Sequence, residues 1–163
     1  AAAPAQLAAH GVKSESAIAQ LKIVQAAAQA MLREQMSDKP VLNSWAEVLD
    51  YLRVAMGFAA REQVRTLFLD RKNRLLHDEV PQHGTVDHAP LYPREIARRA
   101  LELGASAVII AHNHPSGDPT PSQADIATTK DVAVALTAIG VALHDHIVVG
   151  RNRTASFRRL GLI

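Results

Sequence analysis

The 163-residue chain contains no cysteine, which excludes both disulfide bonds and thiolate metal ligands. A reducing compartment is therefore permitted, and we expect a cytoplasmic protein. Long apolar runs are also missing, because no stretch reaches the roughly 20 residues that a membrane-spanning helix needs. The N-terminal run AAAPAQLAAHG lacks the basic and leucine-rich regions of a signal peptide. The sequence thus predicts neither membrane insertion nor secretion.

The chain has little charge of one sign, since 18 Lys and Arg against 16 Asp and Glu give a net charge of +2. So small a charge is weak support for a nucleic-acid-binding surface, and we consider DNA a weak candidate partner. Clusters of arginine do occur, and solvated surfaces explain them more simply than a DNA-binding face does. These clusters are Arg94, Arg98 and Arg99, and Arg151, Arg153, Arg158 and Arg159.

Apolar spacing divides the chain into a helical segment (1–35), a linker (36–43) and one compact domain (44–163). Ser14 is expected to cap a helix that extends to residue 35, and Ser44 a second helix that ends at Gly57. Beyond it, strand and helix patterns alternate. Strands are expected at 64–70, 74–80, 84–89, 106–112 and 142–150, and helices at 93–103 and 122–139. The pattern predicts an α/β fold with a mixed β-sheet flanked by helices.

Three potential metal ligands occur in the run AHNHPSGDPTPSQAD, namely His112, His114 and, eleven residues further on, Asp125. The apolar run before them predicts a buried strand, on which alternate residues face the same side. Both imidazoles can therefore face one ion while Asn113 faces away. Proline and glycine then impose a loop, and we expect a helix to begin at Ser122 with Asp125 in its first turn. The loop would return Asp125 to the histidines.

Two neutral imidazoles and one carboxylate are typical of a catalytic zinc site, because three protein ligands leave the fourth tetrahedral position to water. Zinc can lower the pKa of that water to roughly 7 and polarise a carbonyl. We therefore expect one Zn²⁺ per chain. A proton acceptor is also needed. Spacing favours Glu79, in the expected strand at 74–80, but leaves Asp78, Glu95 and Asp118 open.

The run from His112 to Asp125 resembles the JAMM motif of the JAB/MPN metallopeptidase superfamily. That motif consists of His-x-His, then Pro-Ser, then an aspartate placed as in this chain. Within the superfamily the chain is similar to RadC proteins, a bacterial group long called DNA repair proteins, over residues 45–163. The supporting stretches are LFLDRKNRLL, GTV, YPREIARRALELGASAVIIAHNHPSGDPTPSQAD and LHDHIVVG. The resemblance implies a JAB/MPN-like fold of the cytidine-deaminase-like type.

The same resemblance implies roles for individual residues. It makes His112, His114 and Asp125 the zinc ligands. It places the family's glutamate, five residues before the glycine of GTV, on Glu79 as the general base. The serine of the Pro-Ser pair falls on Ser122, whose hydroxyl would stabilise the oxyanion by roughly 3 kcal/mol. Capping the helix is an equally suitable role for Ser122, so the two roles compete for one hydroxyl.

A second His-x-His pair, His144 and His146, lies in an expected strand without a proline-rich loop or an acidic residue at ligand spacing. We expect His146 or Asp145 to hydrogen-bond a metal ligand, with a surface location as the open alternative. RadC proteins also carry a helix-hairpin-helix element before the catalytic domain. Here Lys13 stands where the second hairpin glycine would be, which disfavours the backbone conformation that cups a phosphate.

Together, these features favour a zinc-dependent hydrolase of peptide or isopeptide bonds, with a peptide or protein as its substrate. Zinc would activate water, Glu79 would carry the proton and Ser122 would help to hold the oxyanion. The alternative is a DNA-repair-associated, nucleic-acid-binding accessory protein in which the metal site is structural or vestigial. A phosphoester hydrolase is disfavoured because no lysine or arginine lies within the motif.

Overall fold

The computed structural model describes residues 14–37, 41, 45–80 and 91–163. The expected strand at 84–89, the hairpin position Lys13 and most of the expected linker lie outside the described residues. So does Ser44, the expected cap of the second helix.

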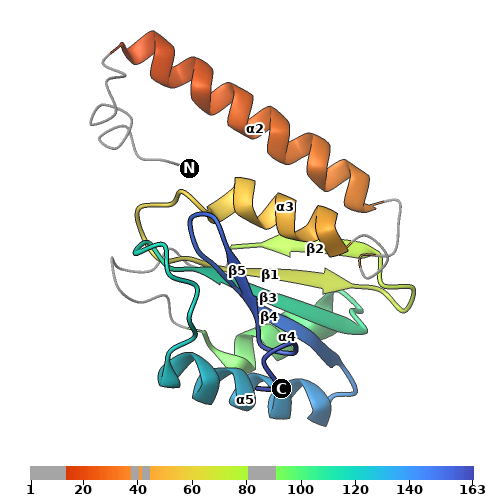
Figure 1. The fold of residues 1–163 in the computed structure, drawn as a ribbon. Coiled ribbons are helices and arrows are strands. Elements are labelled where there is room, and N and C mark those ends of the chain that lie inside the picture. Colours follow the sequence, from red (N-terminus) through yellow and green to blue (C-terminus); the bar gives the residue numbers. More distant parts are fainter. Residues whose placement is uncertain (1–13, 38–40, 42–44, 81–90) are drawn as a thin grey trace.

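A mixed sheet forms the centre of the described chain (Figure 1). Its strands are β1 (Val64–Leu69), β2 (Leu75–Glu79), β3 (Ala107–Asn113), β4 (Ala142–Val149) and β5 (Thr154–Ser156). They lie side by side in the order β2-β1-β3-β4-β5. Only the central pair β3–β4 is parallel; the other pairs are antiparallel. A parallel pair needs a long crossover, and a helix supplies it here.

Helices cover both faces of this sheet, which confirms the predicted α/β class (Figure 1). One face carries α3 (Trp45–Met56), with α2 (Glu15–Ser37) stacked over it, and the other carries α4 (Pro93–Glu102) and α5 (Gln123–Ala138). The side-chain amides of Gln25 and Gln29 donate to the carbonyl of Val54, so the helical segment is tied to the domain that follows. Among the described helices, none is long and apolar enough to span a bilayer.

Each face of the sheet has its own hydrophobic core, because successive strand residues point to opposite sides. On β3, Ile109 packs in the core under α3, whereas Ile110 packs in the core under α4 and α5. His112 lies two residues beyond Ile110 and opposite Val64, a member of the same core. His112 therefore faces the α5 side, where the helix following the loop begins.

Candidate metal centre

The structure brings the three predicted ligands together at the end of β3. The Nε2 atoms of His112 and His114 are 3.0 Å apart. Asp125 Oδ1 is 3.6 Å from Nε2 of His112, and Oδ2 is 3.6 Å from Nε2 of His114. A tetrahedral ion with bonds of about 2.0–2.2 Å needs ligand atoms about 3.3–3.6 Å apart. The two distances to Asp125 lie within this range, and the distance between the histidine nitrogens lies just below it, so the spacing is close to that around a small ion such as Zn²⁺.

Asp125 is held by the start of α5, and the expected cap at Ser122 is confirmed. The Ser122 hydroxyl accepts from the backbone N–H of Asp125 at 3.1 Å, and Asp125 Oδ2 accepts from the backbone N–H of Ser122 at 2.7 Å. This reciprocal pair is a capping box. Oδ2 accepts a further bond from the Ser122 hydroxyl, so Oδ1 is the oxygen left for an ion.

The charge state of Asp125 also suits a ligand. Partial burial by itself raises the pKa of this carboxyl group. The hydrogen bond and charge of His112, with the hydrogen bonds from Ser122, outweigh burial and hold the pKa of Asp125 well below its usual range. The group is therefore ionised at neutral pH.

His114 presents its Nε2 as an acceptor because of the loop that follows it. Its Nδ1 lies 2.8 Å from the backbone carbonyl of Asp118. A carbonyl oxygen can only accept, so Nδ1 carries the hydrogen and, in a neutral ring, Nε2 carries the lone pair. The loop is fixed by the bond from His114 N–H to the Val149 carbonyl at 3.0 Å, and by Gly117, whose φ of 90° suits glycine.

Asn113 faces away from the two histidines, as the alternation on the strand predicts. Its side chain is 1% exposed. The amide oxygen accepts from the backbone N–H of Gln63 at 3.0 Å, and the amide nitrogen donates to the carbonyl of Arg61 at 3.2 Å. Asn113 therefore anchors the strand end that carries both imidazoles.

The second His-x-His pair contributes one residue to the centre, which confirms the expected contact with a predicted ligand. His146 Nε2 lies 2.8 Å from Nδ1 of His112. Burial holds the pKa of His146 well below its usual range, so its ring is neutral. Asp145 instead accepts from the backbone N–H of Arg158, and His144 lies 2.7 Å from the Asn73 side-chain oxygen.

Sequence reasoning missed Thr129. Its hydroxyl lies 2.6 Å from Nδ1 of His146 and 2.5 Å from the backbone carbonyl of Asp125. Thr129 is fully buried on α5. The one signal available in the sequence is its position four residues after Asp125, where a helical hydroxyl reaches the preceding carbonyl.

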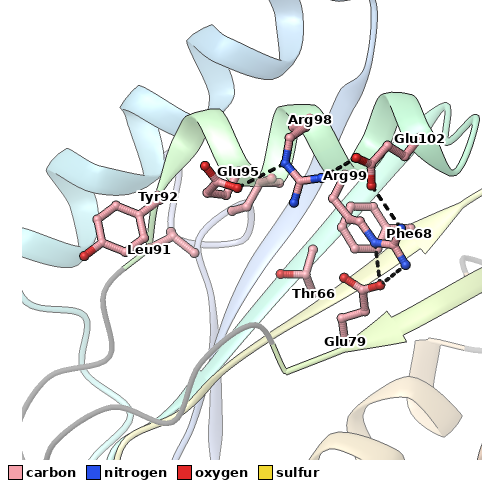
Figure 2. A pocket seen from close by; sticks show the side chains of 10 residues that line it. Thr66, Phe68, Glu79, Leu91, Tyr92, Glu95, Arg98, Arg99 and Glu102 are labelled. Carbon is pink, nitrogen blue, oxygen red and sulfur yellow. Dashed lines mark hydrogen bonds and ion pairs between the residues drawn. The ribbon is translucent and has the colours of Figure 1, made fainter.

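Glu79 lies outside this cluster, in a cavity of about 450 Å³ between the β1–β2 edge and α4 (Figure 2). Its Oε1 accepts from Arg99 Nε at 2.6 Å and Nη2 at 2.5 Å. Thr66 is paired with both Glu79 and Ile110, so Glu79 faces the same side of the sheet as His112, with β1 between them. The residues that line the cavity include none of the three ligands.

The other carboxylates left open by spacing are engaged elsewhere. Asp78 points to the opposite face of β2, where Arg65 Nη1 lies 2.7 Å from both of its oxygens. Glu95 pairs with Arg98 on α4 at 3.1 Å, and the Asp118 carboxylate accepts from the Thr120 hydroxyl at 2.8 Å. Of the four candidates, Glu79 is therefore the one whose carboxylate projects from a strand towards the α4–α5 side of the sheet.

The sequence profile of the RadC-like JAB domain matches residues 42–162. The chain belongs to this family. A curated relative from Rhodobacter capsulatus, named a UPF0758 protein, is 55% identical over 163 residues, which is the whole of this chain and 76% of the relative. The RadC resemblance is therefore confirmed, and the relative's name specifies no activity.

Proposed function

We propose that this RadC-like domain is a zinc-dependent hydrolase that cleaves peptide or isopeptide bonds. The observation that carries the proposal is the convergence of His112 Nε2, His114 Nε2 and Asp125 Oδ1 at one strand end. These three atoms would hold the ion. When bound, zinc would supply an acidified water and a Lewis acid for the substrate carbonyl.

Glu79 is the proposed proton acceptor, and Arg99 controls its carboxylate. Before it can take a proton from the nucleophilic water, Glu79 has to turn from Arg99 towards His112, on the same face of the sheet. Arg99 has a second partner, because its Nη1 lies 3.1 Å from Glu102. The guanidinium thus stays paired when Glu79 leaves, which keeps the electrostatic cost of that movement low.

Ser122 can hold an oxyanion only if its hydroxyl hydrogen leaves Asp125. In the structure that hydrogen points to Oδ2 at 2.7 Å. The backbone N–H of Ser122 remains on Oδ2 after such a rotation, so the carboxylate keeps one of its two donors. We therefore propose that capping and oxyanion stabilisation alternate at this hydroxyl.

The arginines of α4 support hydrolysis of an amide rather than contact with phosphate. Arg98 pairs with Glu95 and Glu102, and Arg99 pairs with Glu79 and Glu102. Their charges are balanced within the helix and the neighbouring strand. Phosphate recognition draws on cations that are available to the ligand, so this face favours an uncharged scissile group such as a peptide bond.

Metal content measured by elemental mass spectrometry tests the site directly. We expect about one zinc per chain in the wild type, and loss of zinc in His112→Ala and in Asp125→Ala. His144→Ala is the matched control, because it alters the other His-x-His pair without touching a ligand, and it should retain zinc. A folded wild-type protein that takes up no zinc when zinc is offered would contradict the proposal.

Activity is tested with fluorogenic peptides and with peptides joined through a lysine side chain. Glu79→Gln should retain zinc and lose cleavage by roughly a hundred- to ten-thousandfold, the range expected for loss of a general base. Glu95→Gln is the control carboxylate on the same cavity and should retain cleavage. Equal activity in wild type and Glu79→Gln would remove Glu79 from the mechanism.

A further inference from the structure

Two buried side chains that are not ligands connect His112 to Asp125. Starting from His112, Nδ1 lies 2.8 Å from Nε2 of His146, whose Nδ1 lies 2.6 Å from the Thr129 hydroxyl. That hydroxyl lies 2.5 Å from the backbone carbonyl of Asp125. His112 and His146 are 2% exposed and Thr129 is 0% exposed. The connection therefore runs without exposure to bulk solvent.

The direction of these hydrogen bonds follows from Thr129. A threonine hydroxyl has a single hydrogen, and a backbone carbonyl can only accept. The hydroxyl therefore donates to the carbonyl of Asp125 and has only lone pairs to offer His146. Consequently His146 must donate from Nδ1.

The direction of the hydrogen bond between His146 and His112 follows from the ring of His146. The ring of His146 is buried and stacked on Phe157, with ring centroids 4.6 Å apart. In its neutral form this ring carries one hydrogen. With that hydrogen on Nδ1, Nε2 accepts from Nδ1 of His112. His112 is thereby left with its lone pair on Nε2, the atom that faces His114 and Asp125.

Both histidines of the centre thus have their acceptor nitrogens turned inward. The Asp118 carbonyl fixes His114 in this form, as its 2.8 Å contact shows. The two Nε2 atoms are 3.0 Å apart beside an ionised carboxylate. At that distance a positive charge has to lie among the three groups, a proton in the metal-free protein and a metal ion when one is bound, so the arrangement is prepared for an ion.

We propose that Thr129 and His146 are positioning residues that prepare the metal centre. They fix the tautomer of His112, and they join the first turn of α5, which carries Asp125, to β4 and β3. The proposal rests on the proposed function in so far as the ion is zinc. Its structural part, the direction of the hydrogen bonds, holds for the protein without metal as well.

Thr129→Val tests the proposal because it removes the hydroxyl and preserves the side-chain shape. His146 Nδ1–H then loses its acceptor, so its hydrogen is free to move to Nε2 and force the hydrogen of His112 onto the ligand atom. Zinc would have to reverse this change in order to bind. Loss of such a supporting group commonly weakens metal affinity ten- to a hundredfold.

Zinc dissociation constants are measured by competition with a chromophoric chelator on the metal-stripped, refilled protein. We expect Thr129→Val to weaken binding by roughly ten- to a hundredfold and Thr129→Ser to restore it. Thr137→Val is the matched control, because Thr137 makes the same bond to the carbonyl four residues back, at 2.7 Å, but is exposed and distant from His146. A folded Thr129→Val protein that binds zinc as tightly as the wild type would overturn the proposal.

Nitrogen-15 NMR of the histidine rings in metal-free wild type supplies a second readout that needs neither zinc nor a folded variant. We expect protonated Nδ1 on His112, His114 and His146. Protonated Nε2 on His146 would overturn the proposal even if zinc binds. Conversely, the expected tautomers in a protein that takes up no zinc would reject the zinc hydrolase and leave the hydrogen-bond direction intact.

Discussion

Two adjacent carboxylates on β2, Asp78 and Glu79, are expected to respond in opposite ways to substitution. Because they point to opposite faces of the strand, Asp78→Ala should destabilise the fold without touching the metal centre. Glu79→Gln should leave the fold intact and abolish hydrolysis. Charge removal from neighbouring positions thus separates a structural role from a proposed catalytic one.

The magnitude for Asp78 follows from its surroundings. Its side chain is 1% exposed and pairs with Arg65, which is 14% exposed. The Tyr51 hydroxyl also donates to Asp78, and burial raises the pKa of Tyr51 well above its usual range, so the phenol keeps its hydrogen. Removing one partner of a buried ion pair costs about 3–5 kcal/mol. For a domain of this size, that lowers Tm by roughly 6–20 °C.

Urea unfolding of the metal-free protein, followed by circular dichroism, measures the effect. Glu79→Gln is the control on the same strand. Its partner Arg99 is 31% exposed and keeps its pairing with Glu102, so we expect an unfolding midpoint equal to that of the wild type. The double variant Arg65→Met with Asp78→Leu should recover part of the loss, because it leaves no unpaired buried charge. If Asp78→Ala unfolds at the wild-type midpoint, or Glu79→Gln is equally destabilised, the assignment of faces is wrong.

Two further predictions concern the supports of the centre, and a third concerns His144. Asn113→Ala leaves the part-buried backbone N–H of Gln63 without its acceptor. It should lower the free energy of unfolding by about 1–3 kcal/mol, measured by urea unfolding; an unchanged midpoint would contradict it. Gly150→Ala should displace the ligand loop and weaken zinc binding in the chelator assay, because the added Cβ would lie 2.4 Å from the Gly117 carbonyl; unchanged affinity would show that the loop adapts. Burial, aided by Arg158, lowers the pKa of His144, so its contribution to stability is intact above the unfolded value of about 6.5 and is lost as pH falls below it. His144→Gln should therefore lose less Tm than the wild type between pH 7.5 and pH 5.5, and equal losses would refute this.

Much of the fold could be predicted because the spacing of apolar residues in the sequence matches the buried side of each helix and strand. The apolar run before His112 predicts a buried strand, and β3 is buried throughout its length. The predicted helices at 93–103 and 122–139 correspond to α4 and α5, with the Ser122 cap in place. By contrast, β5 has only three residues, Thr154–Ser156, which is too short to show alternation.

The base assignment shows where sequence reasoning stops. Spacing does not exclude Asp78 in favour of Glu79, since both follow the same apolar residues. Register separates them, because Glu79 pairs with Thr66 on the α4 side and Asp78 pairs with Leu67 on the α3 side. A shift of one residue in that pairing would exchange their faces. Register depends on the pairing of β1 with both neighbours, which no local pattern encodes.

The predicted ligands can be recognised in the sequence, whereas the residues that support them cannot. To hold one ion, His112, His114 and Asp125 would have to supply particular atoms, so residue type and spacing are both constrained and the motif is visible in the sequence. Thr129 and His146 act by holding a hydrogen in place, a role that many polar residues could fill. What selects them is the parallel pairing of β3 with β4, which sets His146 opposite Ile110, and the packing of α5 against β4. In a centre of this kind the motif specifies the predicted ligands, and the topology of the fold specifies the residues that support them. The metal affinity of the centre should depend on substitutions at Thr129, which belongs to no ligand motif, by the roughly ten- to a hundredfold that is typical of groups that support metal ligands.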